Sequence, residues 1–276
     1  MSNSDVDVVR DFGEEWNEYN QQKINQAKLN YKGFSNYFSI FPDQFLHEDA
    51  IGFDAGCGSG RWARFVAPKV KHLNCLDPSE KAIKVATKNL SEFNNCSFEC
   101  NSINDWSLLD NSQDFGYCLG VLHHIPNTKS ALLKLVSKLK KGSPLLLYIY
   151  YKFDNKPFWF TFIWKASDYL RRLICKLPHK IKLKITKLIA LIIYFPMARL
   201  SLIIENFGFK VSNFPLSIYR KQSFYSMKTD ALDRFGTRLE KRYTKDEIKS
   251  LMKECQLEKI EFSNSEPFWV AIGFKK

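Results

Sequence analysis

The segment GFDAGCGSGR at residues 52–61 constrains the fold of this chain more than any other feature. An apolar run ends at Asp54, three glycines follow at Gly56, Gly58 and Gly60, and a helical pattern comes next. Glycine lets the backbone turn tightly and approach a ligand, and the start of a helix offers free N–H groups. A bare tight turn is the alternative. The G-x-G-x-G spacing differs from the G-x-G-x-x-G of dinucleotide folds and favours a nucleoside cofactor without a pyrophosphate.

Strand and helix patterns alternate around this segment. Short apolar runs predict strands at 50–54, 72–77, 96–100, 114–122 and 144–151, and amphipathic stretches predict helices at 61–70, 79–90 and 128–142. Thr244 and Glu247 form a capping box for one more helix, which two closely connected strands at 257–263 and 267–274 follow. The order predicts an α/β, Rossmann-like, seven-stranded and mostly parallel sheet with a C-terminal antiparallel hairpin strand and a mainly helical insertion.

The same patterns divide the chain into three parts. Residues 1–48 are aromatic and helical and predict an N-terminal cap. Residues 49–151 and 244–276 predict the core, and 152–243 predict a helical, basic and aromatic insertion. Ligands bind at the carboxyl ends of strands in such sheets. Because the insertion begins at the end of a strand, we expect it to form a lid over the substrate pocket.

The basic excess is concentrated in this insertion. The chain carries 41 Lys and Arg against 29 Asp and Glu, a net charge of +12. Residues 152–200 hold eleven of the basic residues and two acids, so the rest of the chain carries only +3. The charge therefore bears on what the insertion contacts, whether an acidic acceptor, a membrane surface or only water.

Residues 180–191 predict an amphipathic helix. Ile181, Ile185 and Leu188 share one helical face, and three lysines share another, namely Lys180, Lys184 and Lys187. A solvated basic face, a membrane-surface contact and an oligomer contact are the alternatives. The longest apolar run, 188–198, has eleven residues and contains a proline, so by itself it is too short to cross a bilayer.

The cysteines and the N-terminus indicate the compartment. The seven cysteines are odd in number, form no CxxC pair and lie mostly in apolar surroundings. This pattern predicts reduced thiols and no zinc site or other metal. It also predicts a cytoplasmic protein, which is membrane-peripheral if the insertion meets a bilayer. The N-terminal sequence is acidic and lacks an apolar core, so we expect no signal peptide.

Three motifs in order carry a family resemblance: D-A-G-C-G-S-G-R, C-L-D-P-S and D-F-G-Y-C-L-G-V-L-H-H-I-P. Together they resemble the class I S-adenosylmethionine-dependent methyltransferases of the small-molecule type, including those that methylate quinones and sugars. The resemblance runs through residues 50–150 and resumes at 243–276. It implies S-adenosyl-L-methionine as cofactor and S-adenosyl-L-homocysteine as product.

The resemblance also implies the cofactor contacts. It places Asp54, Gly56, Gly58 and Gly60 around the methionine moiety, Asp77 on the ribose, Pro78 beside the adenine and Leu119 with Gly120 under the cofactor. Where the family often has Gly-Asp, this chain has Asn101-Ser102, so Ser102, Ile103 or Asp105 are the candidates for the adenine contact. For Trp16 and Tyr19 there are two alternatives: one of them closes over the cofactor, or both only pack the first predicted helix on the core. From the residues alone, Asp77 also suits a helix N-terminus.

Two histidines follow the fourth predicted strand and are the candidate catalytic residues. Methyl transfer needs a base only if the acceptor must lose a proton, and imidazole titrates near neutrality. His124 is preferred over His123; the alternative for both is an ordinary loop residue. Three tyrosines near the end of the fifth strand are candidates for orienting hydroxyls or for packing, namely Tyr148, Tyr150 and Tyr151.

The function predicted is methyl transfer to a small-molecule or lipid-like acceptor by in-line displacement. The alternatives are a nucleic-acid (tRNA) methyltransferase and a non-catalytic cofactor-binding protein. The sequence contains no Asn/Asp-Pro-Pro-Tyr motif and no Pro-Cys motif, and it shows no separate RNA-binding domain, so nucleic acid is disfavoured as a partner. Peripheral membrane contact through the insertion and self-association stay open.

Overall fold

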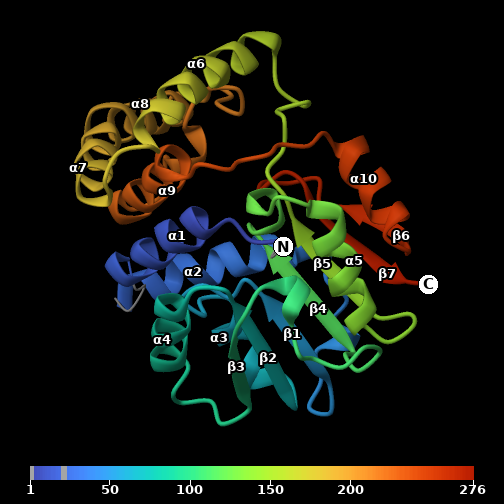
Figure 1. Ribbon diagram of the computed structural model, residues 1–276. Helices are drawn as coiled ribbons and strands as arrows, with labels where there is room; N and C mark the ends of the chain where they lie inside the picture. Colours follow the sequence, from blue (N-terminus) through green and yellow to red (C-terminus); the bar gives the residue numbers. More distant parts are fainter. Residues whose placement is uncertain (1–2, 20–23) are drawn as a thin grey trace. The chain divides into compact units, whose positions relative to one another are not determined.

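The architecture is that of a computed structural model, which describes residues 3–19 and 24–276. Seven strands form one sheet in the order β3-β2-β1-β4-β5-β7-β6 (Figure 1). The strands are β1 (Ile51–Ala55), β2 (His72–Asp77), β3 (Cys96–Cys100), β4 (Phe115–Leu119), β5 (Pro144–Tyr148), β6 (Leu257–Phe262) and β7 (Val270–Lys275). Strands β1 to β5 are parallel, and β7 lies antiparallel between β5 and β6. The predicted Rossmann-like sheet with its antiparallel hairpin strand is confirmed.

Two reciprocal glycine–phenylalanine pairs join the central strands β1 and β4. Gly52 lies opposite Phe115, and Phe53 lies opposite Gly116. A Cβ atom on Gly52 would come within 2.2 Å of the Phe115 ring, and one on Gly116 within 2.1 Å of the Phe53 ring. Each ring thus covers the glycine of the neighbouring strand, one ring on each face of the sheet. A larger residue at either glycine would displace a fully buried ring.

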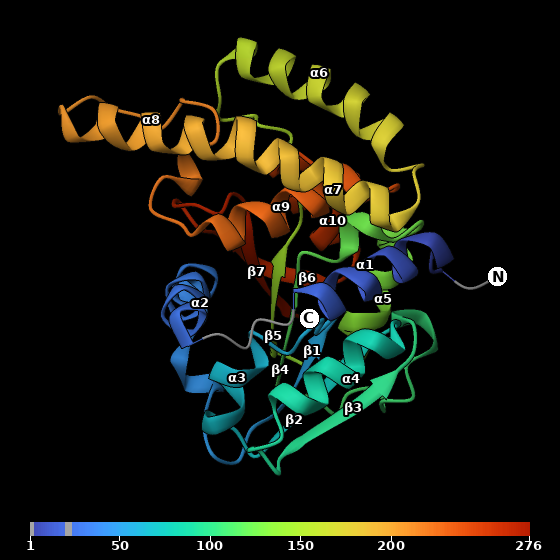
Figure 2. The ribbon, with the colours of Figure 1, turned by 90° about the vertical axis from the view of Figure 1, so that its left-hand side faces the viewer.

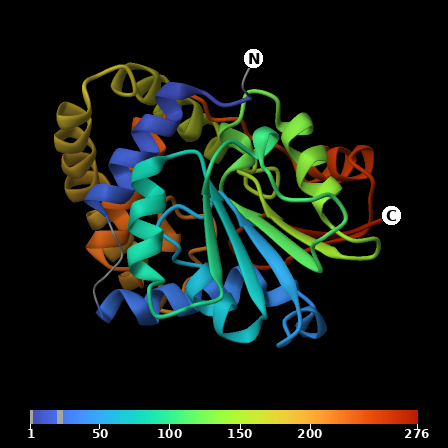
Figure 3. The same cartoon turned by 60° about the horizontal axis from the view of Figure 1, so that its bottom comes forward.

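Helices cover both faces of the sheet, whose strands Figure 3 shows side by side. On one face the core draws on α2 (Ile24–Tyr37), α3 (Ala63–Val66) and α4 (Glu80–Asn89). On the other face it draws on α5 (Thr128–Lys138) and α10 (Lys245–Glu254). The predicted capping box of α10 is present, with the Thr244 side chain and Glu247 each bonded to the other's backbone. The predicted alternation of strands and helices therefore follows from two buried faces.

The helix after the glycine loop is shorter than the sequence pattern predicts. The pattern predicts one helix over residues 61–70, but α3 is a single turn that gives way to a 3-10 turn at Ala67–Lys69. Pro68 is the physical reason, because proline has no N–H to donate to the carbonyl one helical turn earlier.

Residues Phe153–Arg238 form a second compact unit, separate from the unit made of Met1–Lys152 and Leu239–Lys276. The second unit consists mainly of α6 (Phe158–Ile174), α7 (His179–Ile189), α8 (Phe195–Asn206) and α9 (Phe224–Gly236). Its core is a cluster around α9 that includes Met227, Ala231 and Phe235. Residues 239–243, which the sequence places in the insertion, lie in the first unit, as do residues 1–48.

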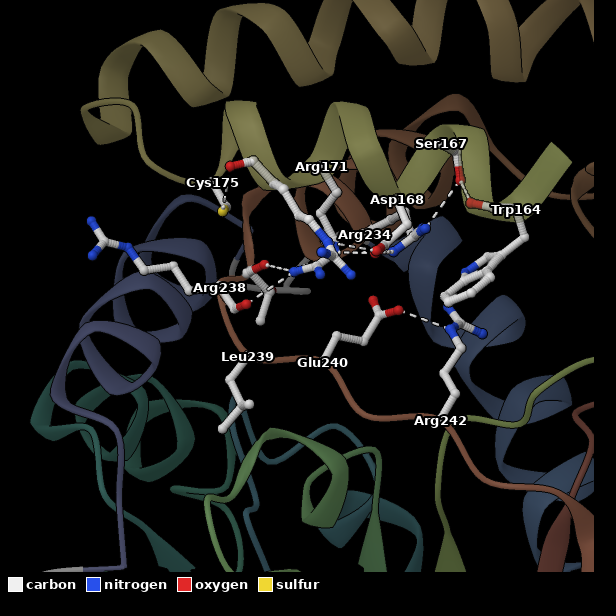
Figure 4. Close-up of polar contacts among 12 residues, drawn as sticks. Trp164, Ser167, Asp168, Arg171, Cys175, Arg234, Arg238, Leu239, Glu240 and Arg242 are labelled. Atoms are coloured by element: carbon white, nitrogen blue, oxygen red, sulfur yellow. Dashed lines mark hydrogen bonds and ion pairs between the residues drawn. The ribbon is translucent and has the colours of Figure 1, made fainter. Parts of the chain in front are cut away.

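A buried ion cluster stabilises the second unit (Figure 4). The carboxylate of Asp168 accepts a bond from Arg171 Nε at 2.7 Å and one from Arg172 Nε at 2.9 Å, and Arg234 approaches it to 3.6 Å. Arg171 also donates to the carbonyl of Thr237 at 2.8 Å. Burial alone would raise the pKa of Asp168, but its arginine partners lower that pKa overall. The cluster joins α6 to α9 and to the end of the unit.

The apolar run of the second unit lies in a longer helix than the sequence predicts. A π-helical turn, Ala190–Tyr194, joins α7 to α8, so that His179–Asn206 is one continuous helix of 28 residues (Figure 2). Pro196 lies inside this helix and does not end it; the π-helical turn comes just before the proline, where a wider turn accommodates the irregular hydrogen bonding. By length and composition this helix could cross a membrane, which is weak evidence alone. The eleven-residue apolar run is thus part of a longer apolar helix.

Candidate active site

The predicted cofactor loop begins where β1 ends. Gly56, Gly58 and Gly60 adopt φ angles of +79°, +54° and +74°, a left-handed backbone that favours glycine. The N–H groups of Gly56 and Cys57 both donate to the carbonyl of Leu76, at 2.7 and 2.9 Å. The loop is therefore anchored to the end of β2, the strand that carries Asp77.

Asp54 stands at the base of this loop and is buried. Its Oδ2 atom has no hydrogen-bond partner among the described residues, and neither has the hydroxyl of Ser59. Burial raises the pKa of the Asp54 carboxyl to about 8; the hydroxyl of Tyr117 offsets part of that rise, and the charge of Asp77 adds to it. A buried acceptor without a partner is costly unless a ligand satisfies it. The loop thus offers unused polar atoms beside three glycines.

Asp77 lies at the end of β2 and holds two segments together. One carboxylate oxygen accepts from the N–H of Gly58 at 3.0 Å, and the other accepts from the N–H of Ser79 at 2.9 Å. Ser79 is the N-cap of α4. Burial raises the pKa of Asp77 to about 6, although both backbone bonds lower it. Asp77 thus shapes the glycine loop as well as being the ribose candidate, and each oxygen keeps a second lone pair.

Helix α1 (Val6–Glu18) lies on the glycine loop and on α4. Gly13 allows the close approach, because a Cβ atom there would come within 2.3 Å of the Ser79 hydroxyl. One turn later, the indole of Trp16 comes within 2.8 Å of the Cβ position of Gly58. The guanidinium of Arg61 lies 5.4 Å from the Trp16 ring and 4.3 Å from the Trp62 ring. Trp16 thus lies on the glycine loop, whereas Arg61 was not singled out from the sequence.

The remaining predicted cofactor residues lie around the strand ends. Pro78 follows Asp77 and is half-buried. Ser102 donates to Asp105 Oδ2 at 2.6 Å, so these two adenine candidates bind each other. Ile103 is buried in the core beside Phe53 and Leu76, which makes it a packing residue in this arrangement. Leu119 is buried at the end of β4.

The two candidate catalytic histidines lie on the 3-10 turn that follows β4. The N–H of Tyr150 approaches His123 Nδ1 at 3.4 Å, and burial lowers the pKa of His123 well below its usual range. His124 Nδ1 lies 2.7 Å from the carbonyl of Leu239. A carbonyl only accepts, so His124 Nδ1 carries a hydrogen, and in the neutral imidazole Nε2 is then the atom with the lone pair. The same logic places the hydrogen of neutral His123 on Nε2.

Aromatic rings surround this histidine pair. The His123 ring stacks on Tyr150 at 3.7 Å, and the His124 ring lies 4.8 Å from Phe12 of α1. Tyr148 lies 5.8 Å from Tyr150, at the carboxyl end of β5. Gly120, which follows β4, has a φ of +80°, and a Cβ atom there would meet nothing within 4 Å. Aromatic rings thus gather around a buried histidine pair near the carboxyl ends of β4 and β5, and the backbone at Gly120 borders open space.

No metal cluster accompanies these groups. Within residues 3–19 and 24–276, no three His, Cys, Asp or Glu side chains are placed to hold a metal ion. The seven cysteines are free, and five of them are buried.

The comparisons with known proteins agree with this geometry. Residues 53–142 match the family model described as a methyltransferase domain. No curated protein matches the chain significantly.

Several solved structures share the fold. An S-adenosylmethionine-dependent methyltransferase of Thermotoga maritima is 14% identical with a TM-score of 0.52, covering 96% of this chain and 100% of its own. A provisionally assigned methyltransferase of Haloferax volcanii, solved with the Trm112 activator, is 11% identical with a TM-score of 0.53, covering 95% and 96%. A provisionally assigned methyltransferase of Bacillus halodurans is 15% identical with a TM-score of 0.52, covering 84% and 72%.

The site residues fit the cofactor of this family. Asp54 supplies a buried acceptor without a partner, and the glycine loop presents backbone that lacks side chains. The positive charge of a bound S-adenosylmethionine would favour the ionised form of Asp54, and its polar groups would meet the unpartnered atoms of the loop. Residues 53–142 are therefore a methyltransferase domain, the first unit has the fold of the class I methyltransferases, and S-adenosylmethionine is the cofactor that the site fits.

Proposed function

We propose that this chain transfers the methyl group of S-adenosylmethionine to a small-molecule or lipid-like acceptor. The ring cluster at the carboxyl ends of β4 and β5 carries the proposal. Phe12, Tyr148 and Tyr150 supply apolar faces around the histidine pair, and Gly120 leaves space beside them. Small-molecule sites combine apolar and aromatic walls with few polar groups, as here.

The tautomers give the two histidines different tasks. His124 Nε2 keeps its lone pair, so it is the atom that would accept a proton from the acceptor. His123 is buried and neutral, and its Nε2–H is a hydrogen-bond donor that has no partner among the described residues. We assign His124 as the base and His123 as a donor that orients the acceptor.

The cofactor supplies an activated sulfonium methyl group when it is bound. The protein then has to align the acceptor for in-line attack and exclude water from it. Asp54 and the glycine loop would hold the methionine moiety, and Asp77 the ribose. Trp16, whose ring covers Gly58, would shield that side of the loop from water.

Transfer of a radiolabelled methyl group tests this function. The protein is incubated with methyl-labelled S-adenosylmethionine and, separately, with a small-metabolite extract, a lipid extract, total RNA and total protein. We expect label in the metabolite or lipid fraction. Label in RNA or protein alone would contradict the proposal. Heat-denatured protein is the background control, and an Asp77→Ala sample at subsaturating cofactor should incorporate less label than wild type.

A further inference from the structure

The second unit exposes an unusual share of the large hydrophobic side chains. Among the described residues, 18 of the 22 exposed ones lie within Phe153–Arg238. On α6 four of them recur at helical spacing along one side, with exposed fractions of 52–88%: Phe158, Phe162, Tyr169 and Leu173. Exposed apolar surface of this extent marks an interaction site rather than ordinary solvent contact.

The continuous helix His179–Asn206 has one buried side and one exposed side. The buried side packs in the core of the unit through Thr186, Ala190, Tyr194, Ala198 and Ser201. The opposite side, which we call the α7–α8 face, carries Lys180, Lys184, Lys187, Leu188, Leu191, Ile192 and Phe195, all exposed. Only 28% of the most apolar stretch of the helix is buried. The helix is therefore not the enclosed core helix of a globular unit.

The charge of the second unit is equally one-sided. Phe153–Arg238 holds sixteen Lys and Arg against five Asp and Glu, a net charge of +11, while the rest of the chain carries +1. Two of those acids, Asp168 and Glu205, already bind arginine or lysine partners. The three lysines of the α7–α8 face have no carboxylate partner among the described residues. Their positive charge is thus available to an external anion.

We propose that the α7–α8 face docks on the surface of an anionic lipid bilayer. Lysines in the first turns would contact lipid phosphates, while Leu191, Ile192 and Phe195 in the following turns would enter the region between headgroups and acyl chains. Both halves lie on one side of one helix, so they can meet the same surface. Aliphatic side chains beside the lysines suit a lipid rather than a nucleic acid, whose bases and phosphates need polar or stacking partners.

The packing of the helix favours lying on the membrane over spanning it. Ala190, Tyr194 and Ala198 are held against α9 in the core of the unit. α9 carries Lys228, Asp230 and Arg234, which a bilayer interior would not accommodate without large cost. An interfacial position buries the exposed side and keeps the packed side intact.

Vesicle sedimentation of the full chain tests the proposal. We expect the protein to bind vesicles of phosphatidylcholine mixed with phosphatidylglycerol and to bind vesicles of phosphatidylcholine alone much more weakly. The variant Lys180→Glu/Lys184→Glu/Lys187→Glu should lose at least about tenfold of the affinity for anionic vesicles. The variant Leu191→Ser/Ile192→Ser/Phe195→Ser should lose about tenfold on the same vesicles.

A matched variant distinguishes an effect of the lysines on the α7–α8 face from an effect of the net charge of the chain. Lys88→Glu/Lys249→Glu/Lys253→Glu changes exposed lysines of α4 and α10 by the same total charge. It should keep vesicle affinity within about twofold if the charge acts locally. Cofactor binding by calorimetry and the melting temperature should be unchanged in all three variants, which shows that they are folded.

Four results would overturn the proposal. The first is no binding of the wild type to anionic vesicles, and the second is an equal loss in the matched variant. The third is tighter, salt-dependent binding to RNA that the lysine variant alone abolishes, which would identify nucleic acid as the partner. The fourth is a dimer in sedimentation velocity that the serine variant dissociates, which would show that the face joins two copies of the chain.

Discussion

The first unit (Met1–Lys152 and Leu239–Lys276), here called the methyltransferase unit, and the second unit (Phe153–Arg238), here called the inserted unit, differ in their charge and apolar surface. The methyltransferase unit is nearly neutral, and its hydrophobic side chains lie in two enclosed layers against the sheet. The inserted unit carries almost the whole positive charge and leaves much of its apolar surface uncovered. The difference shows that the net charge of the chain describes one part of it, and that the cofactor candidates all lie in the other part.

The comparison also separates two kinds of buried polar group. In the inserted unit, Asp168 is surrounded by arginines and its pKa is lowered, as expected for a structural ion cluster. In the methyltransferase unit, burial raises the pKa values of Asp54 and Asp77, and Asp54 lacks a full set of partners. Raised pKa values beside unpartnered atoms characterise a functional site.

Removing the inserted unit should have the largest effect, because it separates the functions assigned to the two units. Joining Lys152 to Leu239 by a short flexible linker leaves every cofactor candidate in place, since all of them lie in the methyltransferase unit. We expect cofactor affinity within a few-fold of wild type and vesicle binding at background. If the insertion is the predicted lid, acceptor turnover also falls to background. Calorimetry, vesicle sedimentation and labelled-methyl transfer measure the three quantities, and retained turnover would refute the lid.

The next largest effect should come from His124→Ala. If His124 removes a proton from the acceptor, turnover should fall by about a hundredfold. Cofactor affinity and vesicle binding should not change. Steady-state kinetics with calorimetry on the same sample checks this, and His123→Ala is the companion variant, in which KM should rise more than kcat falls. Full activity of the His124→Ala protein would show that no base is needed there.

Asp77→Ala should weaken cofactor binding by about tenfold, or about 1.4 kcal/mol. The change removes the acceptor for the N–H groups of Gly58 and Ser79 as well as the ribose candidate. Asp77→Asn keeps one acceptor oxygen, so its cofactor affinity should lie between those of the wild type and Asp77→Ala. Titration calorimetry measures all three proteins, and an unchanged affinity in Asp77→Ala would rule out the ribose role.

Asp54→Asn should show its effect in the pH dependence of stability. The Asp54 carboxyl holds its proton up to about pH 8 in the folded protein, whereas an unfolded chain loses it near 3.8. The wild type therefore loses stability as pH rises from about 4 to 8, by at most about 1.4 kcal/mol per pH unit. Asparagine cannot ionise, so the variant should gain stability relative to wild type over that range. Melting curves of the ligand-free proteins at pH 5, 6.5 and 8 would contradict this if the difference stayed constant.

Local patterns predicted the sheet and the glycine loop because both depend on short-range sequence. Buried strands, a capping box and glycines with left-handed backbone leave direct signals in the residues. Pro68 and Pro196 mark the limit of prediction from local patterns, because Pro68 shortens a helix and Pro196 lies inside one. Whether a proline ends a helix depends on the backbone hydrogen bonds around it, which packing determines.

The details of the site depended on contacts between distant segments. The tautomer of His124 depends on the carbonyl of Leu239, 115 residues away in the chain. The position of Trp16 over Gly58 depends on how α1 packs on α4. No periodicity or spacing encodes either contact, so the sequence could name these residues but not their roles. Arg61 was missed for the same reason, although its place directly after Gly60 was a signal.

The inserted unit leaves and rejoins the sheet at neighbouring points, because Tyr151 forms a bridge with Tyr243 and Lys152 N–H donates to the Tyr243 carbonyl at 2.9 Å. Such a junction lets evolution exchange whole modules, since a different segment between the same two points would leave the order of the strands unchanged. Replacing this one segment would change the cellular surface or the acceptor that such a protein binds. The residues that hold the methyl donor would stay the same.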